Sequence, residues 1–185
     1  MLDRSGSIYY EDFYEAVDFV YNVTKWLNIG TSTDNLLVSI ITFSNTIIEE
    51  FDLDDYTSKT DLLTAIEGVK SRTPNGQTYT HEALEYCYQT SFTTSHGSRN
   101  GVPKAVVVLT DGISTNTGQT QTQAAILQNA GIEVYAIGIG SVVQSSMSEL
   151  QAIATDPDSE YVNTVGTFSN LCLLVPELVP KLGKL

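Results

Sequence analysis

Two patterns of hydrophobic residues alternate along the chain, one typical of helices and one typical of strands. Across residues 11–27 apolar side chains recur every three or four positions, which predicts an amphipathic helix. Across residues 104–112 (KAVVVLTDG) they are nearly continuous and branched, which predicts a strand buried on both faces. Extended along the chain, the same two patterns predict strands at 36–43, 44–53, 104–112, 132–140 and 160–165, and helices at 11–27, 58–69, 80–90, 122–131, 146–155 and from 167 onward.

This alternation predicts the α/β fold class, with a doubly wound, mostly parallel central sheet and helices on both of its faces. Two glutamates within residues 44–53 indicate a strand at the edge of that sheet. Ser146 and Glu149 have the spacing of a capping box and predict the start of a helix. Neither a linker nor an internal repeat interrupts the 185 residues, so we expect a single domain over residues 1–185.

The charge of the chain narrows the choice of partners. It has 9 Lys and Arg against 22 Asp and Glu, a formal net charge of -13. Nucleic acid is disfavoured as a partner because phosphate groups bind to basic patches. The acidity is compatible with cation binding, with a basic partner or simply with a soluble surface. No apolar run reaches the roughly 18 residues of a membrane-spanning helix, so we expect no membrane span.

Several reactive residues have an ordinary structural explanation. Cys87 and Cys172 fall on apolar faces of helices that we expect on opposite sides of the sheet, which predicts two buried free thiols rather than a disulfide or a zinc site. The aspartates of residues 52–55 lack the glycine and bidentate glutamate of an EF-hand loop, which predicts a solvated charge run. Asn22 begins an Asn-Val-Thr sequon off the apolar stripe and is a candidate glycosylation site, although lone sequons often arise by chance.

Oxygen-bearing side chains gather in three segments that the predicted fold brings together. The first is the loop DRSGS (3–7), the second is the loop before helix 80–90, and the third is the carboxyl end of strand 104–112. In parallel sheets ligands bind at the carboxyl ends of the strands, where the winding reverses. We therefore expect one site at this end of the sheet, which we call the rim. Its candidate residues are Asp3, Ser5, Ser7, Thr78 and Asp111.

Two carboxylates and three hydroxyls form a set of hard ligands. Such oxygen atoms suit Mg²⁺, Mn²⁺ or Ca²⁺, whereas zinc or copper prefers nitrogen and sulfur. With only two acids present, a bound ion would keep an open coordination position for an incoming carboxylate. The segment 3–7 taken alone could instead cap the helix that follows it, but Thr78 and Asp111 favour an ion site.

Motifs of common enzyme classes are missing from the sequence. Ser5-Gly6-Ser7 lacks the leading glycine of a hydrolase G-x-S-x-G turn, and no P-loop GK[ST] is present. Gly138-Ile139-Gly140 lies within a predicted strand rather than in a dinucleotide-binding turn. We therefore rank a binding module well above an enzyme.

The segments DRSGS (3–7), GQTYTHEAL (76–84) and VVVLTDG (106–112) resemble, in order, the metal-ion-dependent adhesion site (MIDAS) of the von Willebrand factor type A family. The resemblance extends over nearly the whole chain, and GVPKAVVVLTDG is most similar to the matrilin and collagen VI branch. It implies a Rossmann-like fold with an ion site made by Asp3, Ser5, Ser7, Thr78 and Asp111.

The resemblance also implies a function. In the family the metal presents an open site to a glutamate or aspartate of a protein ligand. This implies a divalent-cation-dependent, secreted adhesion or matrix module that uses Mg²⁺ (or Mn²⁺ or Ca²⁺) and binds a collagen-like or other matrix protein. Tyr79 and His81, beside Thr78, become candidate ligand contacts on the rim. A metal-independent structural matrix module and an intracellular or membrane-complex A domain remain as alternatives.

One departure from the family concerns the first strand. The family has a full apolar strand before the first aspartate, whereas only Met1 and Leu2 precede Asp3 here, and no signal peptide is recognisable. We therefore expect the first strand to be largely missing, and the chain to be either an N-terminally truncated fragment of a larger multi-domain protein or the product of a start codon assigned too late.

Overall fold

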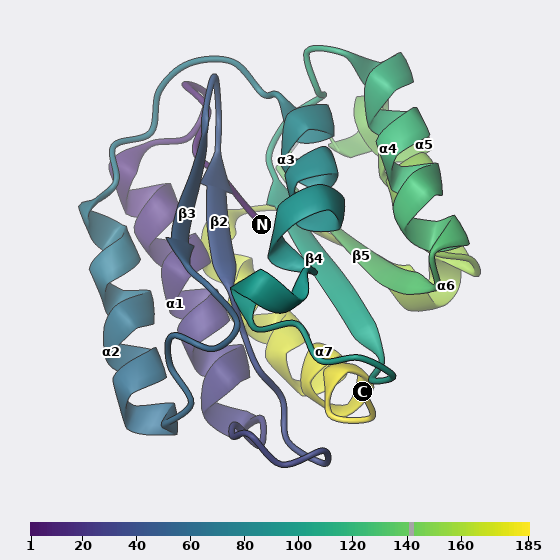
Figure 1. Ribbon diagram of the computed structural model, residues 1–185. Coiled ribbons are helices and arrows are strands. Elements are labelled where there is room, and N and C mark those ends of the chain that lie inside the picture. Colours follow the sequence, from purple (N-terminus) through teal and green to yellow (C-terminus); the bar gives the residue numbers. More distant parts are fainter. Residues whose placement is uncertain (141–142) are drawn as a thin grey trace.

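The structure is a computed structural model that describes the backbone of residues 1–140 and 143–185, with side chains outside 141–146. A six-stranded sheet lies between two layers of helices (Figure 1). The strand order is β3-β2-β1-β4-β5-β6, and every neighbouring pair is parallel except β2 with β3. The predicted fold class and the predicted edge position of β3 are confirmed. The strands are β1 (Leu2–Asp3), β2 (Ile40–Phe43), β3 (Ile47–Phe51), β4 (Lys104–Thr110), β5 (Ile132–Ile139) and β6 (Val162–Val165).

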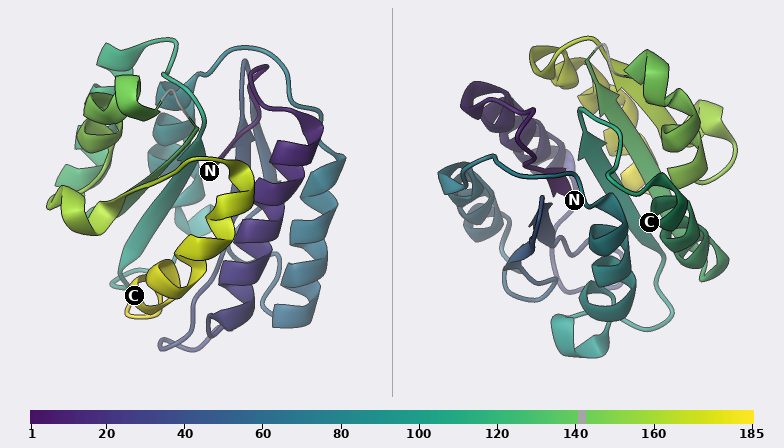
Figure 2. Two further views of the ribbon diagram at one scale, coloured as in Figure 1. Left: turned by 180° about the vertical axis from the view of Figure 1, so that it is seen from behind. Right: turned by 90° about the horizontal axis from the view of Figure 1, so that it is seen from above.

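The helices divide between the two faces of the sheet (Figure 2). One face carries α1, α2 and α7, and the other carries α3, α4 and α5. Their bounds are α1 (Tyr10–Trp26), α2 (Lys59–Gly68), α3 (Thr80–Tyr86), α4 (Thr117–Asn129), α5 (Val143–Ile153), α6 (Asp158–Tyr161) and α7 (Val175–Leu182), with 3₁₀ turns at Val69–Ser71, Thr94–His96 and Phe168–Leu174 and a π-helical turn at Cys87–Ser91.

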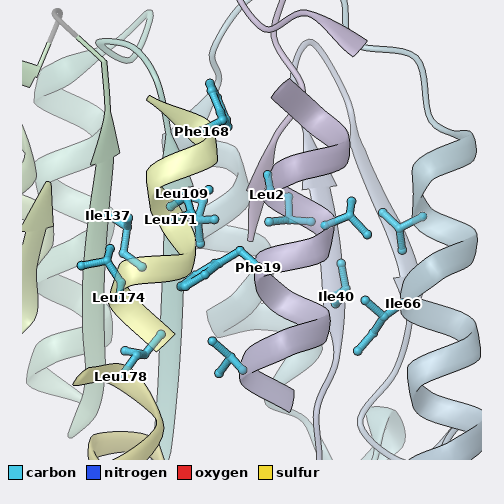
Figure 3. Close-up of a cluster of buried hydrophobic side chains, with 14 of the residues drawn as sticks. Leu2, Phe19, Ile40, Ile66, Leu109, Ile137, Phe168, Leu171, Leu174 and Leu178 are labelled. Carbon is cyan, nitrogen blue, oxygen red and sulfur yellow. The ribbon is translucent and has the colours of Figure 1, made fainter. Parts of the chain in front are cut away.

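Strands β4 and β5 are mainly apolar because each of their faces packs against helices. In β4, Val106 and Val108 contribute to the core under α3, α4 and α5, while Leu109 joins the opposite core. Neighbouring residues of β4 thus face opposite cores, as the two-residue period of a strand requires. On the second face, Leu109 and Ile137 meet Phe19 of α1 and Leu171 near the C-terminal end (Figure 3).

Strand β1 occupies the centre of the sheet although it contains only Leu2 and Asp3. Leu2 is fully buried, pairs with Thr42 of β2 and with Leu109 of β4, and packs in the core shown in Figure 3. Beside it lies a cavity of about 200 Å³ with a mainly apolar lining that includes Val38 and Val107. The two strands that flank β1 are therefore joined to it only at their ends near the rim.

Three predicted element boundaries are wrong. The strand predicted at 36–43 is regular only from Ile40, because the ladders with β1 and β3 reach no further back. Helix α4 begins five residues before its predicted start because the Asn116 side chain accepts a hydrogen bond from the backbone N–H of Gln119 at 3.1 Å. Helix α5 begins at Val143, three residues before its predicted start at Ser146. The predicted capping box of Ser146 and Glu149 includes Ser146, whose side chain lies outside the described residues.

The prediction of two buried thiols is half wrong. Cys87 is buried, but Cys172 is exposed. The segment Phe168–Leu174 is a 3₁₀ helix, in which side chains three apart share a face. Phe168, Leu171 and Leu174 therefore face the core, and Cys172 lies on the opposite side.

The two cysteines are expected to differ strongly in reactivity. Burial raises the pKa of the Cys87 thiol to about 11, so at pH 8 it forms far less reactive thiolate than an ordinary thiol with a pKa of about 8.5. With a disulfide reagent under native conditions, we expect one fast equivalent that disappears in Cys172→Ser and persists in Cys87→Ser. Reaction of both thiols at equal rates in the folded protein would contradict this assignment.

Candidate metal centre

The rim at the carboxyl ends of the parallel strands holds the predicted oxygen ligands. Asp3 is the last residue of β1, and Asp111 directly follows β4, the neighbour of β1. The β1–α1 loop is fixed against the 72–79 loop by two backbone hydrogen bonds, from Gly6 N–H to the Gly76 carbonyl at 2.9 Å and from Asn75 N–H to the Arg4 carbonyl at 2.8 Å. Loops far apart in the sequence therefore meet at one place.

Four of the predicted ligands are joined by a chain of hydrogen bonds. The Ser5 N–H donates to Asp3 Oδ1 at 2.8 Å, which bends the backbone so that the serine lies beside the carboxylate. The Ser5 and Ser7 hydroxyls are 3.2 Å apart, and the Ser7 hydroxyl donates to Asp111 Oδ1 at 2.8 Å. The alternation of Ser5 and Ser7 thus directs both hydroxyls into the space between the two aspartates.

Thr110 is a residue of this site that the sequence analysis missed. Its hydroxyl donates to Asp3 Oδ2 at 2.6 Å, and the Gly112 N–H donates to the same hydroxyl oxygen at 3.3 Å. Thr110 therefore fixes the buried carboxylate from the side of β4. Its signal in the sequence is a lone hydroxyl at the end of an otherwise apolar strand.

The electrostatics of the rim favour a cation. Asp3 is buried, and this burial raises its pKa to about 6, against the opposing effect of the hydrogen bonds from Thr110 and Ser5. Burial also raises the pKa of Asp111, while the Ser7 hydrogen bond lowers it. Among the described residues neither aspartate forms a salt bridge, and the Arg4 guanidinium donates to Thr46 instead. Two desolvated carboxylates without a counter-charge are costly, and a bound cation would remove that cost.

The spacing of the oxygen atoms fits a small divalent ion. Neighbouring ligands of an octahedral Mg²⁺ site lie roughly 3.0 Å apart when each metal–oxygen bond is about 2.1 Å. The separations of 2.8 Å and 3.2 Å between the Ser7 hydroxyl and its two neighbours are close to that edge length. An all-oxygen donor set of this kind matches the chemistry of Mg²⁺, Mn²⁺ and Ca²⁺.

Thr78 reaches the same rim through its backbone. Its N–H donates to the Thr115 hydroxyl at 3.2 Å, and its carbonyl accepts from the Thr115 N–H at 2.9 Å, so it lies against the loop that follows Asp111. On the other side, the Gln77 N–H donates to Asn45 Oδ1 at 2.6 Å. Within the hydrogen bonds of the described residues, the Thr78 hydroxyl is not joined to the four-residue chain. The structure therefore places Thr78 beside these four hydrogen-bonded residues, and none of the described hydrogen bonds joins its hydroxyl to them.

Tyr79, His81 and Asn22, the remaining sequence candidates, lie at different places. Tyr79 donates its N–H to the Ser44 carbonyl at 3.3 Å, and its ring centroid is 5.7 Å from that of His81, so both half-buried rings border the rim. Asn22 lies in the last third of α1 and is exposed, while Thr24 of the same sequon is buried.

Glu149 supports the loop that carries Asp111. This buried carboxylate accepts from the Ser114 N–H at 3.1 Å, and the Ser114 hydroxyl accepts from Thr120 at 2.9 Å. Helix α5 thereby holds the β4–α4 loop in place. The sequence analysis assigned Glu149 to a helix start because local spacing cannot reveal a partner 35 residues away.

Comparison with known proteins places these features in a family. The model of the von Willebrand factor type A domain matches residues 1–177. The chain is 33% identical over 182 residues to human integrin alpha-E, covering 96% of this chain and 15% of that protein. It is 32% identical over 184 residues to the mouse collagen alpha-4(VI) chain, covering 98% of this chain and 8% of that protein. The chain thus spans less than a sixth of either relative.

A solved structure is also similar over most of the chain. It is that of proximal thread matrix protein 1 from the mussel byssus, described as having a zinc-occupied MIDAS motif. The TM-score is 0.83 at 29% identity, and the match covers 96% of this chain and 46% of that chain.

None of the helices described here combines the length and the apolar character that a bilayer crossing requires.

Replacing Thr110 by valine is expected to destabilise the rim. Thr110→Val preserves the shape of the side chain but leaves the buried Asp3 Oδ2 without its donor, which should lower the free energy of unfolding by about 1–3 kcal/mol. Urea denaturation in EDTA measures this change. Thr64→Val on the exposed face of α2 is the matched control and should stay within about 0.5 kcal/mol of wild type. Equal losses in the two variants would contradict the role of Thr110.

Gly76 is expected to tolerate no side chain. Its φ is +88°, and an added Cβ would lie 2.8 Å from Asn45 Oδ1, so Gly76→Ala should cost about 1–3 kcal/mol and displace the loop that carries Thr78. Gly68→Ala is the matched control because that position is helical with open space around it, and it should be neutral or stabilising. Thermal unfolding of both variants tests the difference. Unchanged stability of Gly76→Ala would show that the loop is not constrained as described.

Proposed function

The chain belongs to the von Willebrand factor type A domain family, and from that premise we propose that it is a divalent-cation-dependent protein-binding module of a matrix or adhesion protein. The observation that carries the proposal is the hydrogen-bonded chain Asp3–Ser5–Ser7–Asp111, whose buried and half-buried carboxylates have no cationic partner among the residues that the structure describes. Its relatives above are an integrin alpha chain and a collagen chain, which supports a binding role over an enzymatic one.

We assign the ion to Asp3, Ser5, Ser7, Thr78 and Asp111, with Mg²⁺ as the ion and Mn²⁺ or Ca²⁺ as substitutes. The zinc reported for the mussel relative is compatible with this choice, because zinc binds most sites of a given ligand set more tightly than earlier divalent metals of the first row do. The serine hydroxyls would bind directly, and Asp3 would remain oriented by Thr110 and by the Ser5 N–H. Gly6 would allow the close approach of the two loops.

The bound ion would supply an electrophilic position for a carboxylate of the protein ligand. The residues around it determine whether that carboxylate can approach. With a formal net charge of -13, the protein repels an acidic group in the absence of the ion, so ligand binding should depend on the metal. Tyr79 and His81 border the site and would contact the ligand beside its carboxylate.

The surroundings of this module are also part of the proposal. We infer an extracellular location in a larger multi-domain protein, with a collagen-like or other matrix protein as ligand. Both relatives are much longer than this chain, which supports such an architecture. Exposed Asn22 would then be available for glycosylation on the helical face away from the sheet.

Magnesium binding is the first test of the proposal. Titration calorimetry should show saturable binding of Mg²⁺ to wild type and at least about 100-fold weaker binding to Asp111→Ala, because that variant loses one of the two carboxylates. Asp61→Ala, which removes an exposed acid from the first turn of α2, is the matched control and should bind like wild type. Circular dichroism confirms that each variant is folded. Equal affinities of wild type and Asp111→Ala would exclude the rim as the site.

Ligand binding is tested on immobilised matrix proteins with the same variants. The proposal predicts binding that EDTA and Asp111→Ala both abolish and that Asp61→Ala preserves. Binding that persists unchanged in EDTA would instead identify a metal-independent structural matrix module.

A further inference from the structure

A second group of metal-ligating side chains lies away from the rim. It consists of Glu49 in β3, Asp52 just after β3 and His96 in the 3₁₀ turn Thr94–His96, and one ligand atom of each lies within 4.8 Å of the others. Because β3 is antiparallel to β2, its last residue pairs with the first residue of β2. The group therefore lies toward the end of the sheet opposite to Asp3 and Asp111. In Figure 1 the β2–β3 turn is at the top, and the chain leaves β3 downward.

The three side chains already have the spacing of ligands around one ion. His96 Nδ1 is 2.8 Å from Asp52 Oδ1 and 3.5 Å from Glu49 Oε1. Ligands bound at about 2.1 Å are separated by roughly 3.0 Å in an octahedral site and roughly 3.4 Å in a tetrahedral one. An ion can therefore enter between these atoms with only small movements of the side chains.

One oxygen of the group is unsatisfied. Glu49 Oε1, the atom that faces His96, is itself buried although the Glu49 side chain is 23% exposed, and it has no hydrogen-bond partner among the described residues. Burial is also the main cause that raises the pKa of Glu49, and the neighbouring Asp52 adds to it. In the described part of the chain the only basic side chain within salt-bridge distance of Glu49 and Asp52 is His96 itself, at 3.5 Å and 2.8 Å. A buried acceptor without a partner is costly, and a cation at this position would satisfy it.

The backbone around the group is held in place on both sides. The Asp52 N–H donates to Asp55 Oδ2 at 2.8 Å, which closes the turn after β3. The Leu53 N–H donates to the His96 carbonyl at 3.3 Å. Gly97 has φ +77°, and a Cβ there would lie 2.6 Å from the Asp54 nitrogen, so the two segments approach more closely than any other residue would allow. A site whose ligands are positioned by such contacts is preorganised.

We propose that Glu49, Asp52 and His96 bind one first-row transition-metal ion of the zinc class. The imidazole nitrogen favours zinc, cobalt or nickel over magnesium and calcium, so this site differs in ion preference from the rim. Three protein ligands leave a further position for water. Because β3 and the Thr94–His96 turn lie more than 40 residues apart in the sequence, the ion would fasten the segment after α3 to the edge strand.

Cobalt binding followed by NMR of the imidazole groups tests this proposal directly. The chain has two histidines, so His81 serves as the internal control for His96. In the Asp111→Ala variant, which removes a carboxylate from the rim near His81, and in excess Mg²⁺, equimolar Co²⁺ should broaden the His96 ring signals through its unpaired electrons and leave the His81 signals sharp. Broadening of neither ring, or of both equally, would overturn the proposal. The group would then be an ion pair of His96 with Glu49 and Asp52.

Zinc affinity in four variants provides the second measurement. In the Asp111→Ala background and in excess Mg²⁺, His96→Ala and Asp52→Asn should each weaken Zn²⁺ binding by at least about 10-fold. Asp54→Asn, beside the group but outside it, should bind like the Asp111→Ala parent, which should retain this site even if it loses the one at the rim. Asp52→Asn preserves the shape of the side chain and remains informative if His96→Ala is unstable. Unchanged zinc affinity in both His96→Ala and Asp52→Asn would refute the proposal.

Discussion

The arrangement of the rim depends on the burial of one carboxylate, Asp3, at the end of the central strand. A buried carboxylate without a positive partner is tolerated only when its oxygen atoms are hydrogen-bonded. Here the Ser5 N–H satisfies one oxygen and the Thr110 hydroxyl satisfies the other. Because the two donors come from the loop after β1 and from β4, this single group fixes the relative position of both. The remaining oxygen ligands follow from where those segments are placed.

A short β1 can hold the centre of the sheet because its contacts are concentrated near that carboxylate. Leu2 fills the core beneath the rim, and the amino group of Met1 donates to the Val107 carbonyl at 2.9 Å. Farther from the rim, β2 and β4 have no ladder with β1, and the cavity of about 200 Å³ lies in this region. The rim is thus the better-ordered end of the central strands in terms of hydrogen bonding and packing.

The sequence predicted the features that depend on local periodicity and missed those that depend on distant partners. The apolar runs of β4 and β5 and the helical stripes indicated the layered α/β fold, and the motif spacing brought Asp3, Ser5, Ser7 and Asp111 together. Cys172 was misplaced because the segment around it repeats every three residues instead of every 3.6. Thr110 and Glu149 were missed or misread because their partners, Asp3 and Ser114, are 107 and 35 residues away.

The contact between Asp52 and His96 is another feature that the sequence could not reveal, because the two residues are far apart in the chain. In the sequence Asp52 belongs to an acidic run, yet in the fold it lies 2.8 Å from an imidazole that follows it by 44 residues. The two ends of the sheet consequently present different chemistry, oxygen atoms alone in the proposed site at the rim and an imidazole nitrogen between carboxylates at the edge strand. A strongly acidic protein attracts cations over its whole surface, so net charge cannot select among them. Selection must come from ligand type and spacing, and in these two properties the two proposed sites differ.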